Sequence, residues 1–251
     1  MKTKTLALLL GVLALPLVAG GVQAAPYHDW RGQYVSLQWL HASSGATQLA
    51  FAPDGTGDTA FGGADLGPAS STGGTVHQDL VGNGLGLAYT KLWQRDRLVV
   101  GLEGSMAWPE LSATTHSNFG GGTTPVTQKT SLSWMLALTS KLGIALGNWL
   151  PYVKTGPVLA GVSSKLAGAA YGQAATFSAN GLHKGWLTGF GVDYAPAWPH
   201  SGKWMVGLEY DDAQFSSVNH GGMTNPDNTW PVAYSVKPSF HSWTMQVAYR
   251  F

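Results

Sequence analysis

Three pairs of histidine and serine are close enough in the sequence to suggest acyl-transfer chemistry. They are His41 with Ser43, His116 with Ser117, and His241 with Ser242. A serine can attack an ester when its hydroxyl lies within hydrogen-bond reach of a histidine whose ring is oriented by a third group. Adjacent residues of an extended strand point to opposite faces, so only His41 and Ser43 can share one. No acidic partner is evident near His41. We therefore interpret these residues as solvated polar positions and predict no catalytic residue and no enzyme activity.

Other site chemistries have less support. The chain has no cysteine, which excludes disulfides and thiolate metal sites. Asp54, Asp58 and Asp65 lack the ligand spacing of a recognised calcium loop. Glycine-rich stretches at 73–74 and 120–122 do not follow a strand and open a helix, as a phosphate-binding loop does. We expect no metal and no cofactor.

The composition describes the scaffold that carries these residues. Charged residues are 11% of the 251, against roughly 25% in soluble domains, and the chain contains 34 glycines and 11 tryptophans. So little charge does not suit the surface of a soluble enzyme, and an apolar content of 44% argues against disorder. A bundle of membrane-spanning helices is poorly supported, since no run of about 18 apolar residues follows the N-terminus. The composition is that of an antiparallel barrel in a membrane.

Residues 1–24 are predicted to be a secretory signal peptide. Lys2 and Lys4 provide a basic start, an apolar stretch at 6–18 follows, and Val22-Gln23-Ala24 supplies small residues for cleavage. The mature barrel domain is then residues 25–251. Cleavage removes two lysines, so the formal net charge moves from +1 to −1. That balance offers no basic surface for nucleic acid.

From Trp30 onward, segments with a two-residue period alternate with stretches rich in glycine and polar residues. The clearest segment, 242–251, matches a strand tilted across a bilayer, with its apolar side to lipid and its polar side to the lumen. Seven others lie at 34–39, 84–89, 98–106, 131–139, 152–162, 186–194 and 204–211. Eight is an even number, as in bacterial barrels. Ten strands stay possible if the 45–75 stretch contains a hairpin.

The joins between the segments alternate in length. Short joins lie at 94–96, 147–148 and 196–202, and long polar joins lie at 45–75, 109–126, 164–181 and 216–234. Outer-membrane barrels alternate short periplasmic turns with long external loops in this way. We therefore predict an all-β fold, an eight-stranded antiparallel up-and-down transmembrane β-barrel.

Charged residues within the predicted strands lie on the face opposite the apolar residues. They are Glu103, Lys141, Lys154, Asp193, Glu209 and Arg250. A lysine or arginine facing lipid at the midplane costs about 2–4 kcal/mol, so these side chains are expected in the lumen. Buried charges there need partners to offset their desolvation. We predict a lumenal charge network of mixed sign.

Six tryptophans are predicted to lie at the two membrane interfaces, where amphipathic rings concentrate. Trp30, Trp93, Trp149 and Trp204 are beside the predicted periplasmic turns, and Trp108 and Trp186 are near the external ends. Ordinary core packing is the alternative interpretation.

Four motifs lie along the mature chain: DWRGQYV at 29–35, VVGLEG at 99–104, KLGIALGNWLPYV at 141–153, and the terminal YRF. With these motifs the chain resembles the small outer-membrane β-barrel family of Gram-negative bacteria, the porin-family or outer-membrane immunogenic proteins. The resemblance implies an eight-stranded barrel of the OmpA-like membrane-domain type in the cell outer membrane. It also implies that Val247, Tyr249 and Phe251 form the C-terminal signal read by the outer-membrane assembly machinery. Pro157 departs from the family pattern and leaves the register of the fifth strand open.

An eight-stranded barrel has an interior just wide enough for side chains to fill. We therefore expect a structural, surface-exposed protein of the cell envelope, with at most narrow, low-conductance porin activity. A lipid A-modifying enzyme of the deacylase type and a loop-mediated adhesin are the alternatives. The expected partners are outer-membrane lipid, lipopolysaccharide and the assembly machinery, and the oligomeric state is left open.

Overall fold

The structure is a computed structural model. It describes residues 28–44, 47–51, 75–119, 124–170, 173–196, 203–223 and 231–251. The predicted signal peptide and the three aspartates of the 45–75 stretch lie outside the described residues. No helix among the described residues has the length and hydropathy to cross a membrane.

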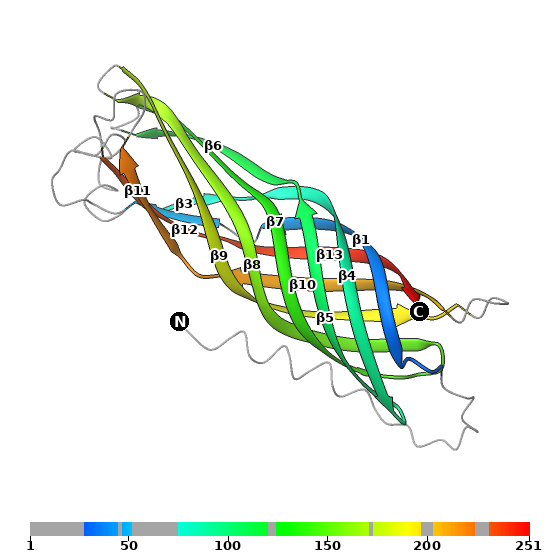
Figure 1. The fold of residues 1–251 in the computed structure, drawn as a ribbon. Coiled ribbons are helices and arrows are strands. Elements are labelled where there is room, and N and C mark those ends of the chain that lie inside the picture. Colours follow the sequence, from blue (N-terminus) through cyan, green and yellow to red (C-terminus); the bar gives the residue numbers. More distant parts are fainter. Residues whose placement is uncertain are drawn as a thin grey trace.

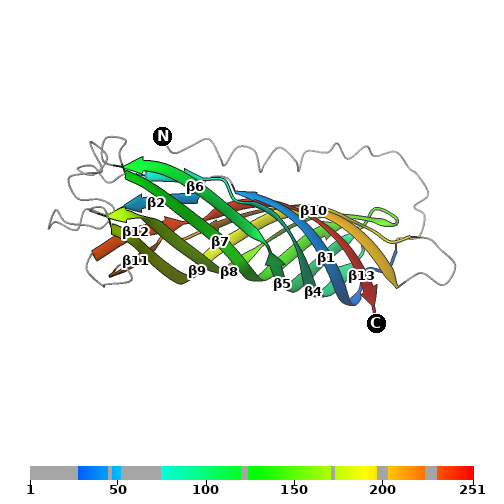
Figure 2. The same ribbon diagram turned by 90° about the horizontal axis from the view of Figure 1, so that it is seen from above.

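Eight long strands form a closed antiparallel ring (Figures 1 and 2). They are β1 (Gly32–Ser44), β4 (Val81–Arg95), β5 (Leu98–Pro109), β7 (Thr124–Ile144), β8 (Trp149–Ala170), β9 (Gln173–Tyr194), β10 (Trp204–Phe215) and β13 (Ser239–Arg250). Their order around the ring is β1-β13-β10-β9-β8-β7-β5-β4, and β1 also pairs with β4. The predicted eight-stranded antiparallel barrel is confirmed.

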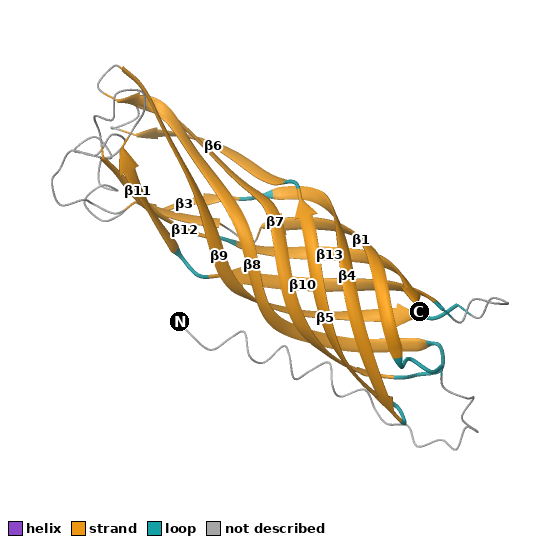
Figure 3. Ribbon diagram, in the orientation of Figure 1, coloured by secondary structure: helices purple, strands orange, loops and turns teal. Residues whose placement is uncertain are grey.

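Five shorter strands lengthen the wall at one end, which we call the hairpin end (Figure 3). They are β2 (Thr47–Phe51), β3 (Thr75–Gln78), β6 (Leu111–Phe119), β11 (Val218–Met223) and β12 (Pro231–Lys237). The interpretation of 109–126, 164–181 and 216–234 as loops is therefore wrong for most of their length, since β8 and β9 stay paired as far as Ala170 and Gln173. A strand that has left the lipid needs no apolar face, so the alternation that reveals strands in a sequence disappears there.

The opposite end, which we call the turn end, connects strands by tight turns. Asp96 lies between β4 and β5 with φ 53°, and Gly147 lies between β7 and β8 with φ 62°. Both values fall in the left-handed region that tight turns use. Phe251 ends the chain at the same end (Figure 1).

The strand that contains Pro157 keeps a regular register. Pro157 pairs with Trp186, and Lys154, three residues earlier, faces the lumen. The irregularity lies in β7 instead, where the register shifts between Leu132 and Trp134. Because Leu132 and Met135 both face inward, this bulge leaves Ser133 and Trp134 together on the outer wall.

The interior of the ring consists of three layers, while its outer wall is lined with exposed aliphatic and aromatic side chains. A hairpin-end cluster fills one end with Leu40, Ala42, Leu80, Ala107, Leu111, Leu132, Met135, Ala137, Val158, Ala160, Val162, Leu187, Ala213, Phe215 and Phe240. A turn-end cluster fills the other with Trp30, Tyr34, Leu92, Val99, Ala145, Leu150, Tyr152, Ala195, Met205 and Ala248. Charged side chains lie between the two. The lumen is thus less polar than the strand alternation predicts.

Candidate functional site: the ion-pair layer of the lumen

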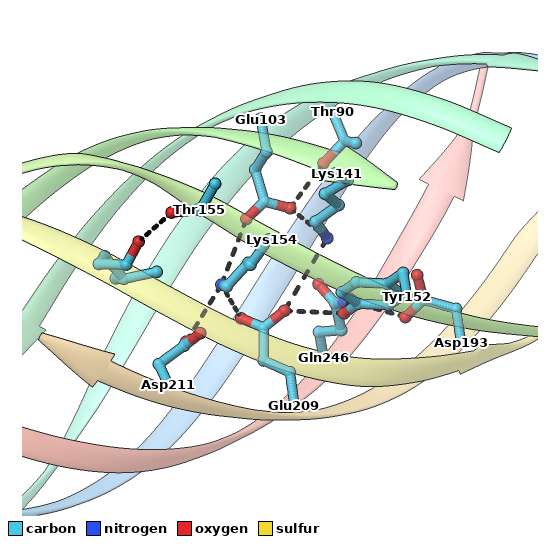
Figure 4. Close-up of polar contacts among 11 residues, drawn as sticks. Thr90, Glu103, Lys141, Tyr152, Lys154, Thr155, Asp193, Glu209, Asp211 and Gln246 are labelled. Atoms are coloured by element: carbon cyan, nitrogen blue, oxygen red, sulfur yellow. Dashed lines mark hydrogen bonds and ion pairs between the residues drawn. The ribbon is translucent and has the colours of Figure 1, made fainter. Parts of the chain in front are cut away.

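Charged side chains from four strands meet in the middle of the lumen (Figure 4). We call the five that form ion pairs the central network: Glu103 of β5, Lys141 of β7, Lys154 of β8, and Glu209 and Asp211 of β10. Every one of these side chains is at most 7% exposed. Two-residue alternation aims all of them inward from their strands.

Lys154 makes the largest number of ion pairs in this network. Its Nζ lies 2.5 Å from Glu209 Oε1, 3.1 Å from Asp211 Oδ2 and 3.6 Å from Glu103 Oε1. Lys141 Nζ lies 2.6 Å from Glu103 Oε2 and 3.9 Å from Glu209 Oε2. Each lysine therefore joins carboxylates from strands on opposite sides of it, which ties β5 to β10 across the lumen.

Neutral groups complete the layer. Thr90 Oγ1 donates a hydrogen bond to Glu103 Oε2 (2.9 Å), and Tyr152 OH donates one to Glu209 Oε2 (2.8 Å). Gln246 Nε2 donates to Asp193 Oδ1 at 2.9 Å. Asp193 is thus held beside the network by an amide, and no lysine of the described residues lies within ion-pair distance of it.

The predicted charge network and the observed one overlap but differ in membership. Glu103, Lys141, Lys154 and Glu209 lie in the network, and Asp193 lies next to it. Asp211 and the neutral partners were missed, although Asp211 follows Glu209 by two residues and so shares its face.

Arg250 was wrongly included. Its Nη1 donates to the backbone carbonyl oxygens of Asp29 and Arg31 at the turn end. Arg250 is the last residue of β13, so it has the inward parity of the network residues but lies beyond the turn-end cluster, which separates it from them.

Glycines leave room for the network but not for an open channel. A Cβ atom added to Gly189 would overlap Asp211 Oδ1, and a Cβ atom added to Gly207 would overlap Asp193 Oδ1. The space that these residues give up is therefore occupied by the charged side chains themselves. The arrangement can hold the strands together, and its buried groups have no room for a substrate.

Trp30 closes the lumen at the turn end. Its side chain is 0% exposed, its backbone N–H donates to Gln94 Oε1 at 2.8 Å, and its carbonyl accepts from Tyr34 OH at 3.0 Å. The interfacial placement predicted for Trp30 is wrong, because β1 begins only at Gly32 and the preceding chain turns into the barrel. The other five tryptophans expose their rings on the outer wall: Trp93, Trp108, Trp149, Trp186 and Trp204.

His28 contacts Trp30 edge-on, with 4.9 Å between ring centroids, and we expect it to make the stability of the turn end depend on pH. Burial lowers the pKa of His28 below 6.5, and the nearby Arg250 guanidinium lowers it further. The folded state thus favours the neutral ring, so its contribution to stability is present above pH 6.5 and is lost as the pH falls below that value. We expect His28→Asn to reduce the loss of stability between about pH 7.5 and pH 5, measured by urea unfolding in detergent micelles. Parallel curves for the variant and the native chain would contradict this assignment.

The histidine–serine pairs take unexpected partners. His41 Nδ1 lies 2.9 Å from Asn83 Oδ1, and His116 Nδ1 lies 3.0 Å from Thr127 Oγ1. Ser242 faces the lumen and is buried, away from His241.

His241 instead lies beside Asp212, with 3.7 Å between Nδ1 and Oδ2. In the strand register His241 pairs with Ser43 on one side and with Asp212 on the other. These three residues form a row across β1, β13 and β10 on the outer wall, which we call the outer row. Sequence spacing could not find it, because it depends on cross-strand register.

A closed antiparallel ring with an apolar outer wall and a filled polar and apolar interior defines the class of outer-membrane β-barrel proteins. The chain belongs to the outer membrane protein beta-barrel domain family, which it matches over residues 12–251. The predicted outer-membrane location is confirmed by this membership. In this class short turns face the periplasm and long hairpins face the outside.

Three solved structures illustrate the likeness. The outer membrane protease OmpT from Escherichia coli aligns with a TM-score of 0.53 at 10% identity, over 91% of this chain and 99% of that one. The outer membrane protein OprG from Pseudomonas aeruginosa aligns with a TM-score of 0.46 at 13% identity, over 88% of this chain and 96% of that one. Ail, the attachment invasion locus protein of Yersinia pestis, aligns with a TM-score of 0.33 at 13% identity, over 88% of this chain and 99% of that one. Identities this low show the fold alone. Comparison with curated proteins gave no match.

Proposed function

We propose that this protein is a structural barrel of the outer membrane that presents its hairpins at the cell surface and conducts at most a very small ion current. The observation that carries the proposal is the filled lumen. Two apolar clusters and the central network between them occupy the interior from the turn end to the hairpin end.

The burial of the network argues against a water-filled path. In an aqueous pore the charged groups would be hydrated, whereas Lys154 and Glu209 are 4% and 1% exposed and contact each other. An ion passing through would also have to displace packed apolar side chains above and below this layer, and it would lose its hydration in doing so. Open porins avoid this by using about 16–18 strands.

Planar-bilayer recording of the purified full chain tests the proposal. We expect no stable openings on the nanosiemens scale, because buried side chains fill the interior of the described barrel. An open porin of about 16–18 strands, recorded under the same salt and voltage, is the positive control. Stable nanosiemens steps from this protein would overturn the closed-barrel proposal.

The outer row supports a second candidate function, acyl-ester hydrolysis at the lipid surface. Asp212 lies on the Nδ1 side of His241, whose ring stacks on Tyr210 with 6.0 Å between centroids and 11° between planes. Within the described residues, neither His241 Nδ1 nor Asp212 Oδ1 has a hydrogen-bond partner. A serine, a histidine and an acid in this order are the elements of a hydrolytic triad, which is recognised by geometry and not by position in the sequence.

The reaction would use these groups in ordinary roles. Ser43 Oγ would attack the ester carbonyl of a lipid acyl chain and pass its proton to the imidazole of His241, which then protonates the leaving alcohol oxygen. Asp212 would orient the ring and stabilise its charged form. Water activated by the same ring would release the fatty acid.

Fatty acid release from lipid A vesicles by the purified protein tests this candidate. If the outer row is catalytic, Ser43→Ala should lower the rate by at least about 10³-fold. Ser242→Ala, which removes a hydroxyl from the lumenal face of the same region, should leave the rate unchanged. Equal rates for the native chain, Ser43→Ala and protein-free vesicles would eliminate the hydrolase and leave the structural barrel as the proposed function.

A further inference from the structure

The exposed charged residues on the outer wall of β7, β8 and β9 toward the hairpin end are lysines. Lys129, Lys165 and Lys184 are exposed on this face. The one acidic residue in the three strands, Asp193, faces the lumen near the turn end. On the flanking strands, Glu110 between β5 and β6 is exposed, and Asp212 of β10, which pairs with Thr188 of β9, is half-exposed. Within these three strands the exposed charges toward the hairpin end are therefore all cationic.

Two of these lysines oppose each other directly. Lys129 of β7 pairs with Lys165 of β8 in the strand register. Like charges in directly opposed positions of a sheet destabilise the pair. A bound anion between them would turn this repulsion into attraction.

A groove of about 400 Å³ lies next to the lysine pair. The bulge in β7 creates it by placing Ser133 and Trp134 together on the outer wall, and Ser163 and Asn180 supply further polar groups to its lining. Hydroxyl and amide groups both donate and accept hydrogen bonds, which suits a ligand with many hydroxyls.

The indole of Trp134 gives the groove an apolar surface. It lies against the backbone of Gly161, where an added Cβ would contact the ring Nε1 too closely to fit. Leu182 contributes a second apolar side chain. A larger residue at Gly161 would therefore displace the indole, which ties the shape of the groove to this glycine.

The lysines lie on both sides of the groove along the strand direction. Lys165 follows Ser163 by two residues, and Lys184 pairs with Leu159, two residues before Gly161. At about 3.3 Å per residue, the two cationic positions are roughly 20 Å apart along the wall, and the lysine side chains can reach toward the groove from both ends.

We propose that this groove binds the phosphorylated sugar headgroup of lipopolysaccharide, with its phosphates near the lysines and its sugar rings against Trp134 and the polar lining. Lipopolysaccharide is the lipid of the outer leaflet, which the hairpin end of the barrel contacts. Its headgroup combines two sugars with negative charge at both ends, which is complementary to cations on both sides of a polar and aromatic groove. Lysine is an established ligand for phosphate, and clusters of basic residues near a membrane surface recognise anionic headgroups.

Binding to the full-length protein in detergent, quantified by native mass spectrometry, tests the proposal. The probes are diphosphorylated lipid A, dephosphorylated lipid A and phosphatidylglycerol. Two lysines contribute about 1 kcal/mol each near an anionic surface, so Lys129→Gln with Lys165→Gln should weaken binding of diphosphorylated lipid A about 30-fold. The control double variant, Arg95→Gln with Lys203→Gln, removes the same charge from exposed positions at the turn end and should leave binding unchanged.

Gly161→Val is a second variant that keeps all the lysines. It should weaken binding of diphosphorylated lipid A through the displaced indole while leaving phosphatidylglycerol binding unchanged. The proposal is overturned if the turn-end double variant loses as much affinity as the Lys129→Gln, Lys165→Gln variant. It is also overturned if dephosphorylated lipid A or phosphatidylglycerol binds as tightly as diphosphorylated lipid A. Circular dichroism identifies any variant that does not fold. The test needs only one of the two groove variants, the double lysine variant or Gly161→Val, to be folded.

Discussion

Replacing Lys154 with methionine is expected to lower the free energy of unfolding by about 3–5 kcal/mol, the usual cost of leaving buried charge without its partner. Lys154 is within 4 Å of three carboxylates, those of Glu103, Glu209 and Asp211. Methionine fills a similar volume but supplies no charge, so all three acids lose a cation at once. Urea unfolding in detergent micelles, followed by tryptophan fluorescence, measures the change.

Asp211→Asn is the informative companion variant. It removes one of the network's carboxylates and leaves Lys154 paired with Glu209 at 2.5 Å, so it should cost much less than Lys154→Met. Lys203→Met, an exposed site at the turn end, should change stability by no more than about 0.5 kcal/mol. If Lys154→Met costs as little as Lys203→Met, the central network does not stabilise the barrel.

Truncating Trp30 to alanine is expected to cost about 3–5 kcal/mol, the range for removing a large buried aromatic side chain. The effect should be large because the ring is fully buried in the turn-end cluster. Unfolding in the same micelles measures it. Trp204→Ala is the matched control, since that ring is 43% exposed on the outer wall and leaves no cavity. Equal losses for the two variants would mean that Trp30 is not part of the packed interior.

Two-residue alternation was sufficient to predict the eight strands of the ring and the inward side of the network residues, because parity is a local property of the chain. It missed the strand residues of the hairpin end, where the alternation is absent. Height along the barrel is not local. The side chain of Arg250 points to the same side of its strand as the network residues, but it lies at the turn end and not at the level of the network. There it contacts backbone carbonyl oxygens. In the same way, the outer row joins Ser43 to His241 through cross-strand register, which depends on how far each strand is shifted against its neighbour when the ring closes.

The apolar layers of the lumen were missed for a related reason. Trp39 and Leu40 are adjacent, as are Trp186 and Leu187, and in each pair one side chain is exposed on the outer wall while the other is buried inside. Adjacent apolar residues blur a two-residue period, so the sequence cannot tell a packed interior from a lipid-facing wall. The position of Trp30 was also missed. Its residue type predicts a membrane interface, but the chain turns into the barrel before Gly32 and places the ring inside.

The position of the central network in the strand order has a consequence for assembly. Its ion pairs connect β5, β7, β8 and β10, which with β9 are consecutive in the ring, and none involves β1 or β13. The β1–β13 seam pairs residues from opposite ends of the chain, so it carries the largest loop-closure entropy and is the last contact expected to form. We expect the ion pairs of Lys141 and Lys154 to form between β5 and β10 before the β1–β13 seam closes, because the strands they connect are nearer in sequence. We therefore expect the ion pairs to favour closure of the ring as well as to stabilise its finished interior.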